Sequence, residues 1–518
     1  MRTLLRGGIV VDPIEGERRA DLVVDGSRIA EIDDELSTAA DRVLDVDGLL
    51  IMPGGIDTHS HADSRVFDDE VQLALLRSGV TTVITGQDGV SFAPGDGEYA
   101  TDYFGALNGT HPDYRGGGVR ELLRSWRGRT RLNVGYLVPA GTVRHQVLGN
   151  AERWPTADEL AAMIGLVREG LEAGALGLST GLDYVPGRFA DAAELAALCR
   201  PLAELGGVYV SHIRGYEEKS AVGVAELIEI CRTAGVPGHV SHFHARPELI
   251  KELLDQARAA GVELSWDAYP YFRGFTLLSM VLLPPEVVRL GNAAAAELLD
   301  DPIQRRRLRE EFDRRYADDP NLGTGWQNRV QVADAGHPRN ADLDGLTLAE
   351  AGRRRGLDPL ELGHRLLAES ALNTTTVMEI PQPRTDGDLA RQFALPGACS
   401  GSDGIFAGGA PHPRAYGSLS RMYSVFGRVR RDFSWPELAS IAAGTAAERF
   451  SLVGRGRVIE GAIADLVVLD PDRIRDRADY QRPTELSDGI DQVLVGGQLV
   501  LQDGRLTGEL AGGPIRRT

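Results

Sequence analysis

The stretch GGIDTHSHAD (residues 54–63) is a short apolar run that ends in two histidines, His59 and His61. Alternate residues of an extended chain point to the same side, so we expect both imidazoles to face the same way. A pair of imidazoles on one side of a strand suits a divalent-metal site, but the pair alone is weak evidence. What the stretch means therefore depends on the rest of the chain.

Seven further runs have the same form, a short β-type run with polar residues at its end, and an amphipathic helical pattern follows most of them. They lie at residues 78–89, 131–141, 174–184, 207–215, 235–245, 261–271 and 395–404. Eight such repeats predict an α/β fold of the (β/α)8 or TIM-barrel type, which we place at residues 53–454. A doubly wound open sheet needs fewer strands, and the sequence has no GxGxxG motif to support one.

The two ends of the chain have a different texture. Residues 1–52 and 455–518 read as short strands between Gly and Asp turns. Neither segment alone can close a sandwich or cover its edges, so we expect both termini to form one small β-sandwich domain. The gap between the seventh and eighth runs is much longer than a usual crossover, which predicts an inserted subdomain at residues 281–347 on the catalytic face.

Composition narrows the function. The 518 residues contain 56 Lys plus Arg against 75 Asp plus Glu, and the net charge of −19 disfavours nucleic acid and anionic membranes as partners. Neither a membrane-spanning stretch nor a signal peptide is recognisable, so we expect a cytoplasmic protein. The three cysteines form no CxxC pair, which excludes a disulfide scaffold and a thiolate zinc site. The oligomeric state stays open.

Three of the other runs also end in groups that bind metals or transfer protons. Run five ends in His212, run six in His242 and run eight in Asp403. The carboxyl ends of parallel barrel strands meet at one face, so we expect these side chains to converge with those of the first run. Neutral imidazoles with a carboxylate suit zinc or a similar ion, and an aspartate beside metal-activated water suits proton transfer. His239, three residues before His242, should point to the other side of its strand.

Several longer motifs carry a family resemblance. MPGGIDTHSHAD (52–63) and GRGRVIEGAIADLVVLDP (454–471), together with the residues just named, resemble the amidohydrolase superfamily. GVTTVITGQDGVSFAP (79–94), GALGLSTGLDYVPG (174–187) and GSDGIFAGGAPHPRAYG (401–417) more closely resemble the N-acyl-D-amino-acid deacylase, or D-aminoacylase, family. The resemblance implies hydrolysis of the amide of a small N-acyl-D-amino acid, with one or two divalent ions, zinc first among them.

The resemblance also implies roles for individual residues. It implies one metal position at His59 and His61, a second at His212 and His242, and Asp403 as general acid and base.

Two further residues are implied to act on the substrate. Arg414 would hold its carboxylate, which a guanidinium can bind through two parallel hydrogen bonds, and Tyr184 would polarise the scissile carbonyl. A surface arginine and a packing aromatic are the simpler interpretations of these two residues. Tyr271, at the end of run seven, and Arg214 are expected to line the pocket, and Asp63 is expected to hold one of the ligand imidazoles.

The chain departs from its relatives at three positions, of which one is Ala140, where relatives often have His, and the other two are Asp88 and His244. Asp88 stands where relatives carry a metal-bridging Cys. A carboxylate can bridge two ions or bind one. Alternatively, the site holds a single ion, and Asp88 is not a ligand but accepts a hydrogen bond beside it. A carboxylated-lysine bridge is disfavoured, because Lys219 and Lys251 are the only lysines and neither ends a run. His244 replaces a Lys that is thought to help bind the substrate carboxylate. It lies two residues past His242 and should face the same pocket.

Three other amidohydrolase reactions and a non-catalytic role are the alternatives to this function. A cyclic-amide hydrolase, a dipeptidase or a deaminase would use the same barrel, but the cyclic-amide enzymes use the missing lysine bridge. Deaminases place a Glu three residues after the run-five histidine, where this chain has Gly215. A non-catalytic barrel is the remaining alternative, and such proteins typically lose the metal ligands that this chain keeps.

Overall fold

The computed structural model describes residues 1–316 and 322–517. At the centre of the described part is an eight-stranded parallel sheet in the order β16-β12-β11-β10-β9-β8-β7-β6. Its strands are β6 (Gly55–Asp57), β7 (Val80–Thr85), β8 (Asn133–Pro139), β9 (Gly177–Gly181), β10 (Val208–His212), β11 (Gly238–Val240), β12 (Leu264–Ala268) and β16 (Ala398–Ser400). The Thr58 N–H donates to the Ser400 carbonyl (3.0 Å) and Ser60 bridges to Gly404, which brings the two end strands together. The predicted barrel is confirmed, and each predicted run supplies one strand.

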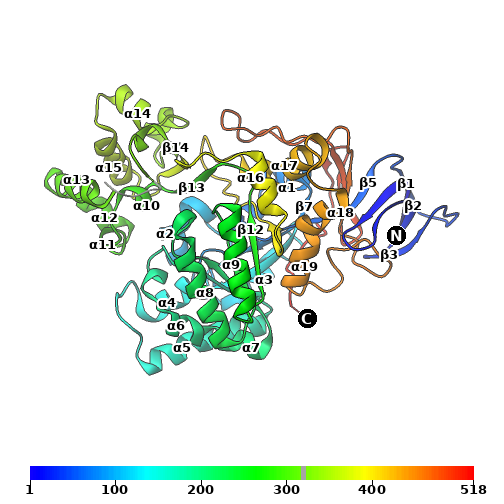
Figure 1. The fold of residues 1–518 in the computed structure, drawn as a ribbon, viewed down its shortest axis with the longest axis horizontal. Helices are drawn as coiled ribbons and strands as arrows, with labels where there is room; N and C mark the ends of the chain where they lie inside the picture. Colours follow the sequence, from blue (N-terminus) through cyan, green and yellow to red (C-terminus); the bar gives the residue numbers. More distant parts are fainter. Residues whose placement is uncertain (317–321, 518) are drawn as a thin grey trace.

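Helices cover the outside of the barrel (Figure 1). In chain order they are α1 (Asp69–Ser78), α2 (Glu98–Asn108), α3 (Gly118–Trp126), α4 (Ala140–Leu148), α5 (Ala157–Ala173), α6 (Ala192–Leu198), α7 (Arg200–Leu205), α8 (Ser220–Ala234), α9 (Pro247–Ala259), α16 (Asp386–Phe393) and α17 (Arg414–Arg421). Because helices pack on one face and side chains fill the interior, every residue of β7 and β8 is buried. Among the described residues, no helix is both long enough and apolar enough to cross a bilayer.

Both chain ends contribute to one nine-stranded sheet, on the opposite side of the barrel from the insertion (Figure 1). Its strands are β1 (Arg2–Asp12), β2 (Gly16–Asp25), β3 (Arg28–Asp33), β4 (Arg42–Asp45), β5 (Leu50–Pro53), β17 (Leu466–Leu469), β18 (Ile490–Val495), β19 (Gln498–Gln502) and β20 (Arg505–Leu506). The two halves join where β5 pairs antiparallel with β17, with Ile51 opposite Val468. Leu22, Val24 and Leu494 share one apolar cluster, so both termini build the same small core, as predicted.

The chain's last residues leave this sheet. The Gly512 N–H donates to the Thr130 carbonyl (3.0 Å), and the Ile515 N–H donates to the Val134 carbonyl (2.9 Å). The predicted β-domain range of 455–518 thus includes a tail that lies along β8 of the barrel. Two short helices, α18 (Trp435–Ala439) and α19 (Thr445–Arg449), precede this range in the chain.

The segment between β12 and β16 forms a projecting unit (Figure 1). It contains β13 (Arg273–Leu277), α10 (Leu278–Leu282), α11 (Pro285–Val288), α12 (Asn292–Asp300), α13 (Pro302–Tyr316), β14 (Val330–Asp334), α14 (Leu348–Arg355), α15 (Pro359–Glu369) and β15 (Thr375–Glu379). β15 pairs antiparallel with both β13 and β14, so this unit reaches beyond the predicted range of 281–347 on both sides. Residues 317–321 of that range lie outside the described residues.

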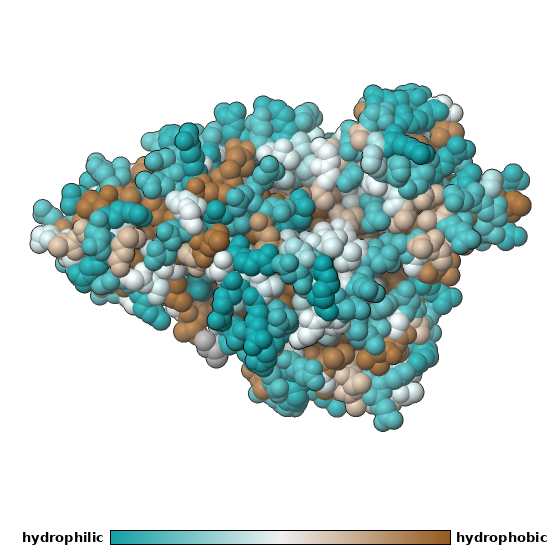
Figure 2. All heavy atoms as spheres, turned by 180° about the vertical axis from the view of Figure 1, so that it is seen from behind, coloured by the Kyte–Doolittle hydropathy of each residue, from teal (hydrophilic) through white to brown (hydrophobic). Residues whose placement is uncertain are grey.

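The surface has no single dominant apolar face on the side shown in Figure 2. Hydrophilic residues cover most of it, and apolar residues appear in separate small groups.

A buried ion pair on the outer helix layer tests how the helices are held. The Arg144 Nε on α4 lies 3.0 Å from Glu194 Oε1 on α6, and the two side chains are 1% and 3% exposed. We expect Glu194→Ala to lower the free energy of unfolding by about 3–5 kcal/mol, because it leaves the guanidinium buried without its anion. Thermal and denaturant unfolding measure this change. Glu204→Ala, which removes the exposed partner of Arg168, should cost less than about 1 kcal/mol; equal losses in the two variants would contradict the prediction.

Candidate metal centre

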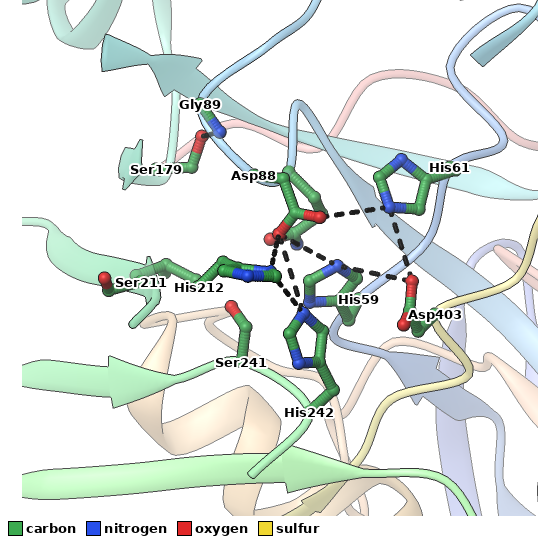
Figure 3. Close-up of polar contacts among 12 residues, drawn as sticks. His59, His61, Asp88, Gly89, Ser179, Ser211, His212, Ser241, His242 and Asp403 are labelled. Carbon is green, nitrogen blue, oxygen red and sulfur yellow. Dashed lines mark hydrogen bonds and ion pairs between the residues drawn. The ribbon is translucent and has the colours of Figure 1, made fainter. Parts of the chain in front are cut away.

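Six side chains from five barrel strands meet at the carboxyl ends of those strands (Figure 3). Two follow β6, one follows β7, one ends β10, one follows β11 and one follows β16: His59, His61, Asp88, His212, His242 and Asp403. The ring centroids of His59 and His242 lie 4.9 Å apart, and those of His212 and His242 lie 4.7 Å apart. The structure therefore brings together all the side chains that the sequence nominated as metal ligands, with Asp403 beside them.

Asp88 lies between two pairs of histidines. Its Oδ1 is 3.5 Å from His59 Nε2, and its Oδ2 is 3.6 Å from His61 Nε2. Oδ1 is also 3.8 Å from both His212 Nδ1 and His242 Nε2. Two atoms bound to one tetrahedral zinc ion are about 3.3 Å apart, given bonds near 2 Å. The spacing of this carboxylate from both pairs thus suits one ion on either side of it.

The donor atoms of this cluster fit a divalent ion. Within the described residues, both ring nitrogens of His59 and Oδ1 of Asp88 are buried and have no hydrogen-bond partner. Buried polar atoms are normally paired, so such a group of orphaned atoms needs a ligand to satisfy it. Two sets of three ligand atoms each fall within 4.8 Å of one another: His59, His61 and Asp403; and His59, Asp88 and His242. Imidazoles with carboxylates are the ligands that zinc accepts.

An asparagine fixes the orientation of His61. The Asn108 amide nitrogen donates to the Val90 carbonyl (3.0 Å), so its Oδ1, 2.8 Å from His61 Nδ1, accepts the ring proton. In the neutral ring that a metal ion requires, Nε2 of His61 is then the nitrogen without a proton, and it faces Asp88 and Asp403. Asn108 is the last residue of α2 and lies in none of the eight predicted runs, so no pattern in the sequence identified it.

The expected role of Asp63 is not what the structure shows. Its Oδ1 accepts hydrogen bonds from the Ser91 hydroxyl and from the Gly86 N–H (3.1 Å), and no hydrogen bond joins its carboxylate to a ligand imidazole in the described part of the chain. Asp63 instead holds the loop after β7, the loop that carries Asp88.

Two other aspartates support the cluster and were not singled out from the sequence. Asp267, at the end of β12, accepts from the His239 ring (2.8 Å) and from the His242 N–H (2.8 Å), and lies 3.8 Å from His59 Nδ1. Burial opposes ionisation of Asp267, but the hydrogen bond from His239 and the contact with His59 still hold its pKa below the usual range. Asp57 accepts from the Ser402 N–H (2.7 Å) and so fixes the loop that carries Asp403.

Asp403 is held between the cluster and an arginine. Its Oδ1 lies 3.4 Å from His61 Nε2, and its Oδ2 lies 2.7 Å from Nη2 of Arg414. Burial opposes ionisation, but the Arg414 guanidinium holds the pKa of Asp403 below its usual range, so the carboxylate is ionised. The arginine packs over Tyr269, with 4.4 Å from its guanidinium carbon to the ring centroid.

The backbone is strained at this centre. Asp88, His242 and Asp403 have φ angles of 55°, 33° and 48°, in the left-handed region that L-residues rarely adopt. Such conformations persist only where the surrounding structure imposes them, and they concentrate at functional sites.

The centre opens into a cavity of about 630 Å³. Tyr184, Arg214, His244 and Arg414 line it, and its apolar lining includes Leu107, Phe275, Met280, Val281, Met378 and Ile380. The guanidinium of Arg214 is occupied by Glu226 (3.0 Å) and by main-chain carbonyls. Burial and the nearby Arg384 guanidinium lower the pKa of His244, so its imidazole is neutral.

Tyr271 does not line this cavity, contrary to expectation. Its ring packs against His412, with centroids 5.4 Å apart, and against the Arg421 guanidinium (5.3 Å). The strand ends at Ala268, and Tyr269, the first residue after it, lines the cavity in place of Tyr271.

Comparison with known proteins agrees with this geometry. Residues 42–282 and 396–501 match the profile of the amidohydrolase family, and the chain belongs to that family. The unmatched stretch between these two ranges includes most of the inserted unit.

Two relatives and two solved structures illustrate the similarity. D-aminoacylase of Alcaligenes xylosoxydans xylosoxydans is 31% identical over 99% of this chain and 97% of its own length. N-acyl-D-glutamate deacylase of the same organism is 32% identical, over 95% and 92%. A D-aminoacylase crystal structure superposes with a TM-score of 0.84 at 29% identity, over 100% of this chain and 99% of the other. N-acyl-D-glutamate deacylase of Bordetella bronchiseptica, complexed with zinc and a phosphonate inhibitor, gives 0.83 at 28%, over 99% of both chains.

The contact between Asn108 and His61 yields a test of the centre. We expect Asn108→Ala to weaken zinc binding about 10- to 100-fold, because His61 loses the partner that fixes its tautomer and ring orientation. Zinc titration in competition with a chromophoric chelator measures this affinity. Asn150→Ala removes an amide far from the centre, hydrogen-bonded to the Arg289 carbonyl, and should leave zinc affinity unchanged. Equal affinities in the two variants would show that Asn108 has no such role.

Proposed function

We propose that this chain is a metal-dependent hydrolase that converts an N-acyl-D-amino acid into a carboxylate and a free D-amino acid. One observation carries the proposal: Arg414 presents a buried guanidinium next to Asp403, at the edge of the imidazole cluster. In an N-acyl amino acid only the α-carbon separates the carboxylate from the amide nitrogen. A grip for that carboxylate adjacent to the hydrolytic centre matches this spacing. The names of the relatives support the same substrate class.

The proposal includes one or two divalent ions, with zinc as the first candidate. His59, His61 and Asp88 would hold one ion, and Asp88, His212 and His242 the other, so Asp88 is common to both positions. When bound, such an ion lowers the pKa of water towards 7 and polarises a carbonyl oxygen. The zinc in the related N-acyl-D-glutamate deacylase structure supports this choice of metal.

Asp403 is the proton carrier in this mechanism. As an ionised carboxylate 3.4 Å from His61, it takes the proton from the attacking water and then gives it to the leaving nitrogen. Arg414 orients the substrate through its carboxylate, which lowers the entropic part of the barrier.

Tyr184 donates a hydrogen bond to the scissile carbonyl. Burial raises the pKa of its hydroxyl well above the usual value, so the group stays protonated. Its ring packs against His212, with centroids 4.9 Å apart, and this contact supports a role beside the second metal position. A donor aimed at a developing oxyanion is effective where water is excluded. His244 adds a neutral polar contact for the substrate.

We further infer a cytoplasmic enzyme whose partner is a small molecule rather than nucleic acid or a membrane. The net charge of −19 and three buried free cysteines support this inference.

The reaction and its general base can be tested together. The purified zinc-loaded protein should hydrolyse N-acetyl-D-amino acids and leave the L enantiomers essentially intact, and chelation should abolish activity until zinc is restored. Asp403→Asn should lower kcat about 10²- to 10⁴-fold, because the amide cannot take the proton. Ninhydrin or chiral chromatography measures the amino acid released. Hydrolysis of hydantoins or deamination of aminopyrimidines, with no action on N-acetyl-D-amino acids, would replace this proposal with another amidohydrolase reaction.

The role of Arg414 has its own test. Arg414→Met should lower kcat/KM about 10- to 100-fold, the worth of charge-assisted hydrogen bonds to a carboxylate. Arg414→Lys keeps the charge without the planar guanidinium. Steady-state kinetics should give it a kcat/KM between those of the wild type and Arg414→Met. An N-acetyl amine, which lacks the carboxylate, serves as the control substrate. If Arg414 acts on the substrate carboxylate and its loss does not disturb Asp403, the wild type and Arg414→Met should hydrolyse this amine at the same slow rate. A parallel loss on that substrate would contradict the assigned role.

A further inference from the structure

The loop after β9 wraps around His212. The Leu182 N–H donates to the His212 carbonyl (3.0 Å), and the Tyr184 ring packs on the imidazole at 4.9 Å between centroids. Between these two residues, Oδ2 of Asp183 lies 3.3 Å from His212 Nε2. Tyr216 covers another side of the imidazole, 5.0 Å away at an interplanar angle of 84°. Asp183, Tyr184 and Tyr216 thus contact the ring, and among the described residues Asp183 is the one that reaches its outer nitrogen with a charged group.

The contacts of the two ring nitrogens define the tautomer that metal binding needs. Nδ1 of His212 faces His242 Nε2 at 3.1 Å and Asp88 Oδ1 at 3.8 Å, so it is the nitrogen directed into the cluster. A ligating nitrogen carries no proton, and the proton of the neutral ring must then sit on Nε2. There the Asp183 carboxylate accepts it. A carboxylate on the outer N–H fixes the orientation of a ligand imidazole and makes its other nitrogen more basic.

We propose that Asp183 is a positioning residue that strengthens metal binding selectively at the position formed by Asp88, His212 and His242. This inference rests on the proposed metal centre and adds a residue to it. Asp183 has no contact with His59 or His61, whose outer partners are Asp267 and Asn108. Asp267 contacts residues of both positions, whereas Asp183 contacts a ligand of the second position, so its removal should change the affinity of that position.

The Asp183 side chain is 45% exposed and lines the cavity beside His212.

Zinc titration of the full chain tests the proposal. After removal of metal by a chelator, zinc is added in competition with a chromophoric chelator, and bound zinc is measured by elemental analysis. In Asp183→Ala we expect the dissociation constant of one position to rise about 10- to 100-fold while the other stays within about twofold of the wild type. Asp183→Asn keeps an oxygen acceptor without the charge. Its dissociation constant at that position should lie between those of the wild type and Asp183→Ala. If the wild type binds a single ion, the affinity for that ion should decrease from the wild type through Asp183→Asn to Asp183→Ala.

A matched control is available on α9. Asp255 is 47% exposed and paired with Lys251 at 2.7 Å, far from the cluster, so Asp255→Ala should leave both constants unchanged. Metal-free melting temperatures establish that each variant folds. Unchanged zinc affinity in Asp183→Ala, or an equal loss at both positions, overturns the proposal even if the hydrolytic function holds. A wild-type chain that binds no zinc overturns the metal centre and this inference together.

Discussion

A carboxylate buried among four imidazoles imposes the main constraint on this protein. The oxygens of Asp88 lie between 3.5 and 3.8 Å from the four rings, and Oδ1 has no hydrogen bond within the described residues. Removing so many polar groups from water is costly unless a ligand pairs them. The barrel allows it because parallel strands direct the residues after them to one face, where loops held by Asp57 and Asp63 fix the details. The polar centre thus depends on closure of the apolar strands beneath it.

The sequence was most informative where local pattern and position on the fold coincide. The eight strands were predictable because each is a short buried run followed by polar residues. The candidate ligands could be nominated because they sit on those strands or directly after them. The union of the two termini in one β domain could be predicted because each terminal segment needs a partner to cover its edges.

The prediction was incomplete where distant segments pair or where the chain leaves a regular element. The limits of the insertion depend on β15 pairing with both β13 and β14, which no local pattern reveals. Tyr269 rather than Tyr271 lines the cavity, because strand alternation no longer applies after Ala268. Asn108 reaches His61 from the end of a helix, so only the tertiary structure identifies it. Asp267 lies within the seventh predicted run (261–271) and could have been nominated with the other carboxylates.

The pairing of β5 with β17 has a consequence for synthesis of the chain. Leu466 lies opposite Pro53, so the partner of this strand emerges from the ribosome 413 residues later (466 minus 53). Until then β5 has an open edge, and contacts this distant in sequence form slowly. While the entire barrel is translated and folds, the edge of β5 therefore stays unpaired, and it is exposed to pairing with other nascent chains.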